Sequence, residues 1–486
     1  MDDSAPKESC GVFGLYAPGS PVSHMVYLGL FALQHRGQEA AGIAVSEGDK
    51  IWVDKDTGLV STIFNDYRLQ TLRGELAIGH TRYSTTGSGD WQNSQPVYRQ
   101  VGEHQFALAH NGNLVNTEPL AAELGVPADG IGSDSDLAAE LLARELHGGS
   151  GDQDELVEAF VRTLPRLSGA YSFVLLSQDA IIGVRDPHGF RPLFLGRLND
   201  GGWALASETP ALDVIDAAVV REIQPGEMVV IDGAGVKSLW PFPAEAIVPK
   251  FCSFEYVYFA RPDGNLRGQN VHRVRQRMGE ALARQAPVDA DAVVPIPESS
   301  VPGAQGYAHE SGIPYVDGFV KNRYIGRTFI APTQQLRRNA VKIKLNPIRE
   351  NIEGKRLVVV EDSIIRATTL LETMRMLRNS GVAEIHLRVL SPPYKWPCWY
   401  GMDTTDQSKL VAAQMSVEQI RTFLGADSLA YLDIDAMLTA ISPEDTTGLC
   451  TACLTGDYPI PVPSHGDSAN GRTDARWTLP IEAVIP

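Results

Sequence analysis

Hydrophobic residues in the first half of the chain occur in short apolar runs separated by Gly, Pro and polar residues. Four runs are typical of β-strands: residues 11–16, 76–81, 106–110 and 171–176. Residues 137–146 instead have helical spacing and follow a Gly-Ser-Asp-Ser-Asp segment, whose Ser and Asp side chains are suited to cap a helix. Strands and helices that mix without a repeating βαβ order predict a layered α+β domain.

The second half has a different pattern. Residues 292–298 and 356–362 are β-branched apolar runs of the kind that parallel sheets bury. A helical pattern over residues 368–379 follows the second run, and another strand is predicted at residues 384–390. This half is therefore predicted to be α/β. The proline-rich residues 241–249 are the expected linker, which gives domains at residues 10–240 and 250–462.

The composition is that of a globular protein, with 43% hydrophobic and 21% charged residues among 486. A formal charge of -17 argues against broad nucleic-acid binding, which needs basic surface. No stretch approaches the roughly 20 apolar residues of a membrane span. The first nine residues lack the apolar core of a secretory signal. Five scattered cysteines indicate a reduced, cytoplasmic protein, and the polar residues 463–486 are expected to form a mobile tail.

Two adjacent carboxylates, Glu361 and Asp362, follow the predicted buried strand that ends near residue 360. Carboxylates at the carboxyl end of a parallel strand lie where α/β sheets bind ligands, and they can accept hydrogen bonds from a ribose diol and lie near Mg²⁺. Backbone N–H groups and hydroxyls at the following helix start can hold a phosphate. The alternative is a helix cap with solvated acids, but the apolar strand and the hydroxyl-rich turn favour a ligand site.

This segment resembles the phosphoribosyl-diphosphate fingerprint of type I phosphoribosyltransferases. The resemblance implies phosphoribosyl-diphosphate contacts from Ser363, Arg366, Ala367, Thr368 and Thr369, and Mg²⁺ ligation by Glu361 and Asp362. Residues 295–299 (PIPES) are similar to a turn near the metal, which adds Ser299 to the magnesium site. Residues 321–330 (KNRYIGRTFI) look like a flexible loop over pyrophosphate, whose charge Lys321, Arg323 and Arg327 would neutralise.

Two residues depart from the amidophosphoribosyltransferase pattern. Ala367 and Ser300 stand where those enzymes usually have Gly. Because an alanine side chain disfavours left-handed backbone, Ala367 is expected to have a negative φ.

Cys10 is followed by Gly-Val-Phe-Gly, and a lone cysteine is more often a small buried apolar side chain. Four further segments change this interpretation, namely residues 34–44, 79–87, 110–114 and 133–136. In order and spacing they resemble the N-terminal-nucleophile glutamine amidotransferases. If residues 1–9 are a propeptide that is removed, Cys10 offers a thiol and an α-amine with a pKa near 8, which can act as its base.

The resemblance implies a role for each of four further residues. The Asn111 side chain and the Gly112 N–H would bind the tetrahedral oxyanion. Arg82 would bind the α-carboxylate of glutamine, and Asp134 would bind its α-ammonium group. A simple turn is the alternative for the His110-Asn111-Gly112-Asn113 segment considered by itself.

Four cysteines remain: Cys252, Cys398, Cys450 and Cys453. Four thiolates suit either tetrahedral zinc or a [4Fe–4S] cluster, and free thiols are the third possibility. Their flanking sequences resemble the cluster-bearing, propeptide-processed type of amidophosphoribosyltransferase, which implies a [4Fe–4S] cluster.

The resemblance extends from Cys10 to about residue 460 and implies a fold, a reaction and partners. The fold would be an αββα sandwich of the N-terminal-nucleophile hydrolase type followed by an α/β phosphoribosyltransferase domain. Glutamine and phosphoribosyl diphosphate would give phosphoribosylamine, glutamate and pyrophosphate, the first committed step of purine synthesis. A homotetramer inhibited by purine nucleotides is expected. The alternatives are another glutamine amidotransferase and a non-enzymatic regulator that binds phosphoribosyl compounds.

Overall fold

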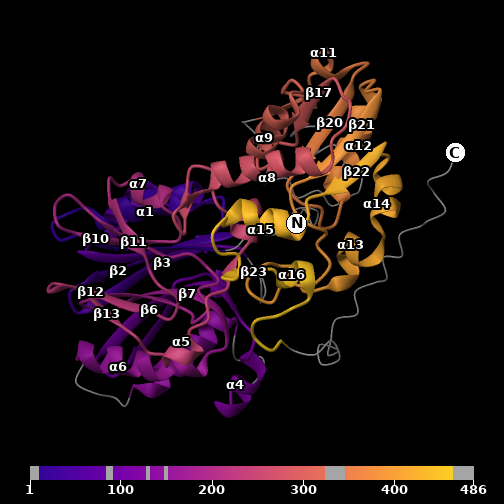
Figure 1. The fold of residues 1–486 in the computed structure, drawn as a ribbon. Helices are drawn as coiled ribbons and strands as arrows, with labels where there is room; N and C mark the ends of the chain where they lie inside the picture. Colours follow the sequence, from indigo (N-terminus) through magenta and orange to yellow (C-terminus); the bar gives the residue numbers. More distant parts are fainter. Residues whose placement is uncertain (1–9, 84–90, 127–131, 147–151, 323–344, 463–486) are drawn as a thin grey trace.

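The computed structural model describes residues 10–83, 91–126, 132–146, 152–322 and 345–462. Two domains are visible, one in indigo to magenta and one in rose to yellow (Figure 1). Within the described residues, no helix is long and apolar enough to cross a bilayer.

Two antiparallel sheets face each other in the first domain. The seven-stranded sheet has the order β11 (Ala218–Glu222), β9 (Phe194–Arg197), β10 (Trp203–Ala206), β1 (Gly11–Tyr16), β4 (Leu76–Arg82), β2 (Ala40–Glu47) and β3 (Lys50–Thr57). The six-stranded sheet has the order β13 (Gly235–Leu239), β12 (Met228–Asp232), β8 (Ile181–Arg185), β7 (Gly169–Leu176), β6 (His104–Leu114) and β5 (Val97–Val101).

Helices cover the outer faces of both sheets (Figure 1). Helices α1 (Val22–Ala32) and α7 (Pro210–Asp213) lie on the first sheet, and α5 (Asp134–Glu145) and α6 (Gln153–Thr163) lie on the second. Because the β1 and β7 strands are apolar on both sides, they are buried between a sheet and a helix layer. The result is the expected αββα sandwich.

A parallel sheet forms the centre of the second domain, in the order β17 (Ala292–Pro295), β20 (Arg356–Glu361), β21 (Glu384–Val389) and β22 (Ser428–Tyr431). Helices α8 (Val271–Gln285), α9 (Val301–Ser311), α12 (Thr368–Asn379) and α14 (Val417–Leu424) pack around it. A small antiparallel pair, β18 (Phe319–Lys321) and β19 (Leu345–Pro347), lies beside it. The predicted α/β architecture is confirmed, although β17 ends three residues earlier than predicted.

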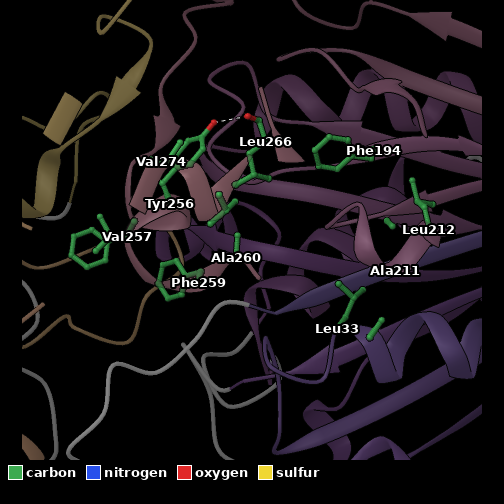
Figure 2. Close-up of a cluster of buried hydrophobic side chains, with 14 of the residues drawn as sticks. Leu33, Phe194, Ala211, Leu212, Tyr256, Val257, Phe259, Ala260, Leu266 and Val274 are labelled. Atoms are coloured by element: carbon green, nitrogen blue, oxygen red, sulfur yellow. Dashed lines mark hydrogen bonds between the residues drawn. The ribbon is translucent and has the colours of Figure 1, made fainter. Parts of the chain in front are cut away.

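Apolar packing continues across the two domains. One buried cluster contains Phe13 and Leu33 of the first domain together with Val274 and Val358 of the second. Figure 2 shows its middle, where the end of α1 and the α7 turn approach the segment that leads into α8. Because burying apolar surface is the main driving force of association, the shared cluster holds the domains together.

A short pair of parallel strands lies at the junction of the second domain with the first. Strand β14 (Phe251–Cys252) pairs with β23 (Leu449–Cys450), so that Cys252 and Cys450 are register partners. The α16 helix (Ala452–Thr455), which carries Cys453, follows directly. The beginning and the end of the second domain therefore meet at the junction with the first.

The expectation for Ala367 was wrong. Its φ is +61°, and it occupies the N-cap position of α12, where its side chain is buried. The chain must turn sharply from β20 into α12, so the backbone takes the left-handed conformation although the residue carries a Cβ. Such a conformation costs an alanine roughly 1 to 2 kcal/mol.

Candidate active sites

Cys10 lies directly before β1, at the edge of the sandwich that faces the second domain, and its side chain is 7% exposed. The thiol donates to the Tyr83 carbonyl oxygen at 3.5 Å. Burial raises the pKa of this thiol, the nearby Arg82 charge lowers it and the Asp134 charge raises it. The thiol therefore needs a base in order to react near neutral pH.

A small cavity opens at the Cys10 thiol. It is lined by Cys10 and Gln95 together with residues from three of the predicted segments: Arg82, Tyr83, His110, Gly112, Ser133, Asp134 and Ser135. Arg82 and Asp134 thus bring opposite charges to one cavity. A free amino acid, with an α-carboxylate and an α-ammonium group, matches that pair of charges.

Asn111 lies within β6, so the His110–Leu114 segment belongs to a strand and not to a simple turn. Its side chain is fully buried, and neither its Nδ2 nor its Oδ1 atom has a hydrogen-bond partner among the described residues. Leaving such a group unpaired costs about 1 to 3 kcal/mol. Asn111 directly precedes Gly112, which lines the cavity at Cys10, so its unpaired amide is a candidate to receive an oxyanion that would supply the missing partner.

Gly112 has a φ of +153°, and a Cβ at this position would lie 2.0 Å from the Ala170 carbonyl oxygen. Glycine is required there because β6 and β7 approach closely. Asp134 is the first residue of α5, which Ser133 caps by accepting from the Asp136 N–H. One Asp134 oxygen accepts from the Leu114 N–H at 3.1 Å, which ties the acid to the same strand as Asn111.

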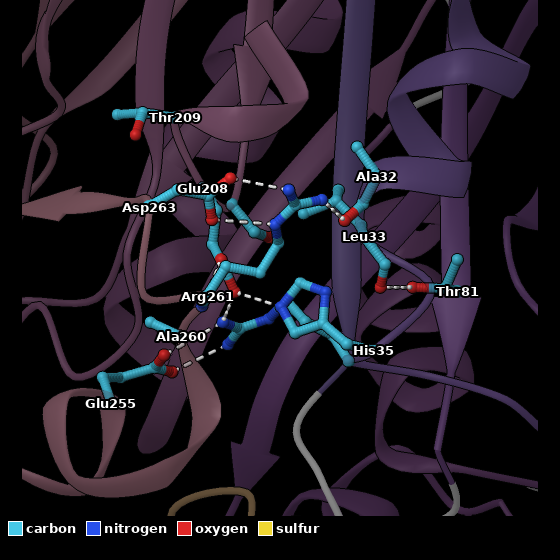
Figure 3. A network of polar contacts seen from close by, with 12 residues as sticks. Ala32, Leu33, His35, Thr81, Glu208, Thr209, Glu255, Ala260, Arg261 and Asp263 are labelled. Atoms are coloured by element: carbon cyan, nitrogen blue, oxygen red, sulfur yellow. Dashed lines mark hydrogen bonds and ion pairs between the residues drawn. The ribbon is translucent and has the colours of Figure 1, made fainter. Parts of the chain in front are cut away.

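Arg36 lies in the predicted 34–44 segment, but no role was predicted for it. Its Nε donates to the Cys10 carbonyl oxygen at 3.1 Å, and its guanidinium group pairs with Glu208 and Glu255. Figure 3 shows the surrounding network, in which His35 also contacts Glu208 at 2.8 Å. The place of Arg36 in the 34–44 motif was the one sign of a role. The pairing with Glu255 could not be predicted, because the two residues are 219 positions apart in the sequence.

The second candidate site lies at the carboxyl end of β20. Ser299 donates to one Asp362 oxygen, and Ser363 donates to the other at 2.6 Å. Burial raises the pKa of both Glu361 and Asp362, and the Asp362 charge raises that of Glu361 further. Two crowded carboxyl groups that resist losing their protons become stable as anions when a divalent cation binds them.

Ser300, the second departure from the usual Gly, is fully buried next to these acids. Its hydroxyl donates to the Ile296 carbonyl oxygen at 2.7 Å and lies 3.5 Å from a Glu361 oxygen. The hydroxyl is thus satisfied within the turn. The helix α9 begins directly after it.

The structure brings the predicted phosphate loop, residues 363–369, to the start of α12. Thr368 is exposed, Thr369 is half-buried, and Arg366 donates to the Asp403 carbonyl oxygen at 3.2 Å. Lys321 lies at the end of β18 and forms an exposed ion pair of 2.9 Å with Glu298, directly before Ser299. Arg323 and Arg327 lie outside the described residues.

The four remaining cysteines converge at the domain junction and form no disulfide. Burial raises the pKa of Cys252 to about 11, and burial also raises those of Cys450 and Cys453. The other thiols of the group contribute to each of these increases, and Cys398 contributes to all three. Four thiols at one junction, one buried and three half-buried, are a donor set for a cationic iron or zinc group.

Comparisons with known proteins follow this division of the chain. The family description "Glutamine amidotransferase domain" matches residues 80–214, and "Phosphoribosyl transferase domain" matches residues 268–400. An amidophosphoribosyltransferase of Mycobacterium tuberculosis is 48% identical over 478 residues, which cover 95% of this chain and 88% of the relative. The chain belongs to the amidophosphoribosyltransferase family.

Other amidophosphoribosyltransferases also match nearly the whole chain. That of Synechococcus elongatus is 47% identical, covering 95% of this chain and 93% of its own. A solved glutamine phosphoribosylpyrophosphate amidotransferase from B. subtilis, in complex with ADP and GMP, is 41% identical with a TM-score of 0.85. The alignment covers 94% of this chain and 98% of that one. The predicted family and fold class are confirmed.

Proposed function

We propose that this chain transfers ammonia from glutamine to 5-phosphoribosyl 1-diphosphate, giving 5-phosphoribosylamine, glutamate and pyrophosphate. The observation that carries this proposal is the cavity at the Cys10 thiol, which Arg82 and Asp134 line with opposite charges, in a chain that also has the acid pair at the end of β20. Membership of the amidophosphoribosyltransferase family supports it. The reaction is the first committed step of purine synthesis.

At the first site, the Cys10 sulfur attacks the side-chain amide carbon of glutamine. The carbonyl π electrons move to oxygen, and the Asn111 side chain and the Gly112 N–H stabilise the resulting oxyanion. The proton taken from the thiol passes to the amide nitrogen, so that collapse breaks the C–N bond, expels ammonia and leaves a thioester, which water hydrolyses to glutamate. Arg82 and Asp134 hold the two charged ends of the substrate, so that the amide carbon lies at the sulfur.

We propose that residues 1–9 are removed and that the α-amine of Cys10 then acts as the base. The raised pKa of the buried thiol supports this proposal, because such a thiol needs an adjacent proton acceptor in order to react. His110, the nearest imidazole in the cavity, makes contacts to Ser135 at 3.0 Å and to the Ala170 carbonyl oxygen at 3.2 Å. N-terminal sequencing of the purified protein tests the proposal, and a chain that begins at Met1 but uses glutamine contradicts it.

At the second site, ammonia attacks the anomeric carbon of phosphoribosyl diphosphate while pyrophosphate leaves. Glu361, Asp362 and Ser299 are the residues that would hold Mg²⁺, which neutralises charge on the leaving group. Loop residues 363–369 offer N–H groups and hydroxyls to the 5-phosphate at the start of α12. Lys321 pairs with Glu298, directly before Ser299, and is expected to exchange that partner for pyrophosphate.

Pyrophosphate release from phosphoribosyl diphosphate tests the reaction, with glutamine or ammonium as the nitrogen source. We expect both nitrogen sources to support release. Binding of phosphoribosyl diphosphate without pyrophosphate formation would instead favour the regulator alternative.

We further propose that Cys252, Cys398, Cys450 and Cys453 hold a [4Fe–4S] cluster. Zinc at about 2.3 Å from each sulfur needs sulfurs roughly 3.8 Å apart. In the described part of the chain, no three His, Cys, Asp or Glu side chains meet closely enough to hold a single ion. Since each cysteine of a cuboidal cluster binds its own iron, a cluster does not need the close approach of sulfurs that a single zinc ion requires, which favours the cluster.

Finally, we propose a cytoplasmic homotetramer that purine nucleotides inhibit. The B. subtilis enzyme was solved in complex with ADP and GMP, which supports a nucleotide effect on this relative of it. Light scattering and inhibition assays with ADP and GMP test both points.

A further inference from the structure

A single buried carboxylate of the second domain contacts two arginines of the first. Glu255 begins a π-helical turn (Glu255–Phe259) and has no exposed side-chain surface. Its oxygens accept from Arg36 at 2.7 and 2.9 Å and from Arg191 at 3.0 Å. Both guanidinium groups are also fully buried. We call Arg36, Arg191, Glu208 and Glu255 the junction network.

Each of these arginines also holds a backbone carbonyl. Arg36 donates from Nε to the Cys10 carbonyl oxygen at 3.1 Å. Arg191 donates from Nε and Nη2 to the Tyr400 carbonyl oxygen at 3.1 and 2.9 Å, two residues beyond Cys398. Glu255 therefore orients one guanidinium group against the nucleophile residue and another against the loop that carries Cys398.

The turn that carries Glu255 is itself fixed from the second domain. Arg275 of α8 donates to the Tyr256 carbonyl oxygen at 2.7 Å and to the Ala260 carbonyl oxygen at 2.9 Å. Tyr256 donates its hydroxyl to the Leu266 carbonyl oxygen at 2.6 Å (Figure 2). Glu255 is thus held by the second domain while its carboxylate reaches into the first.

Burial opposes the charge on Glu255, but the Arg36 and Arg191 charges keep its pKa below the usual value. Without this carboxylate, both cations would remain buried, and of the two only Arg36 pairs with Glu208. Arg36 would then lose two of its hydrogen bonds and its fixed orientation. Because Cys10 carries both the thiol and the proposed basic α-amine, a shift of about 1 Å in its backbone can lower the rate by roughly 100-fold.

We propose that Glu255 is a positioning residue for glutamine hydrolysis, acting from the second domain through Arg36 on the backbone of Cys10. The inference rests on the proposed function of Cys10 as nucleophile. It makes the first site depend on docking of the second domain, whereas the second site, which uses ammonia directly, does not depend on Glu255. A merely structural role would instead lower both activities together.

Glu255→Gln tests this inference because it removes the charge and keeps the shape. We expect kcat with glutamine to fall roughly 10- to 100-fold while pyrophosphate release with ammonium stays within about twofold. Labelling of Cys10 by the glutamine analogue 6-diazo-5-oxonorleucine, followed by mass spectrometry, should slow by a similar factor. Glu255→Asp should recover part of both rates, because it keeps the charge.

Glu227→Gln is the matched control. Glu227 is a buried carboxylate paired with Arg221 at 2.6 Å in the first domain, but it contacts neither Cys10 nor the second domain. Its variant should leave the ratio of the two activities unchanged. If Glu255→Gln does not fold, Arg36→Lys provides the same test, because lysine keeps the charge and loses the Nε donor.

Failure of the positioning role of Glu255 and failure of the proposed enzyme function give different results. Equal loss of both activities in Glu255→Gln, or loss of neither, overturns the positioning role while the enzyme remains active. A wild-type protein that forms no pyrophosphate overturns the proposed function instead, and the rate of Cys10 labelling then still decides whether Glu255 positions the thiol.

Discussion

Asn113 donates from its Nδ2 atom to the carbonyl oxygen of Trp399 at 2.9 Å, across 286 positions of the chain. Asn113 is two residues from Asn111 on β6, and Trp399 is next to Cys398. Gly401 packs against the same strand, since a Cβ there would lie 3.3 Å from the Gly112 Cα. The strand that carries Asn111 and Gly112 is therefore packed directly on the loop of the second domain that carries Cys398.

Asn111→Ala is expected to separate stability from activity. Removing an oxyanion donor should lower kcat with glutamine by about 100- to 1,000-fold. Because the two amide atoms are buried without partners, their loss should leave the melting temperature unchanged or raise it. Steady-state kinetics and calorimetry of the same preparation measure the two effects. A large drop in melting temperature would show that the amide stabilises the ligand-free fold.

Cys10→Ala should abolish glutamine-dependent synthesis, because no other thiol lines the cavity. Synthesis with a high ammonium concentration should remain, since the second site does not need the thiol. Pyrophosphate release with each nitrogen source measures both. Loss of the ammonium-dependent reaction as well would contradict the division of labour between the sites.

Ala367→Gly should stabilise the second domain. Glycine removes the Cβ strain of a φ of +61°, and its greater freedom in the unfolded chain offsets part of that gain. We expect a net increase of about 0.5 to 1 kcal/mol in the free energy of unfolding, measured by denaturant titration. Ala383→Gly is the matched control: Ala383 is exposed and has no positive φ, so it should destabilise by a similar amount.

Magnesium binding should strengthen as the pH rises. The pKa values of Glu361 and Asp362 are both raised, so protons compete with Mg²⁺ for this site up to a higher pH than at ordinary carboxyl groups. Without metal, these groups contribute stability below their raised pKa values and lose it as the pH increases through them. Calorimetric titration in two buffers of different ionisation enthalpy should therefore detect proton release.

Glu361→Gln provides the control for that measurement. It removes one titrating group, so proton release on binding should decrease together with magnesium affinity. An affinity that does not depend on pH in the wild-type protein would show that the acids are already ionised.

The purified protein should be brown and contain about four irons per chain. Cys450→Ser should lose the iron, because Cys450 lies in the β14–β23 pair with Cys252. Cys10→Ala should keep it, since Cys10 lies outside the cysteine group. Iron analysis and visible absorbance measure both variants, and stoichiometric zinc in a colourless wild-type protein would contradict the cluster.

Local sequence patterns predicted the helices and strands well. They did not predict the contacts between residues of the two domains. The helix over residues 368–379 was predicted to the residue, because strand, turn and helix periodicities change sharply there. Helix α5 begins three residues earlier than predicted, because Ser133 caps it and brings Asp134 into its first turn. The Arg36–Glu255 pair left no local signal, since such a contact depends on how two separately folded surfaces meet.

The conformation of Ala367 shows a second limit. An alanine is assigned a negative φ by its own preference, but here the required path from β20 to α12 outweighs that preference. Tertiary context of this kind cannot be obtained from one residue's propensity.

The pairing of β14 with β23 also has a consequence for how the protein is made. About 200 residues separate the two strands, so the ribosome has to synthesise nearly the whole second domain before β23 is available. At roughly 5 to 20 residues per second, a nascent first domain waits about 10 to 40 s for its partner. During that interval Glu255 has been synthesised but is not yet held by a folded second domain. If docking completes the site around Cys10, unfinished chains do not consume cellular glutamine.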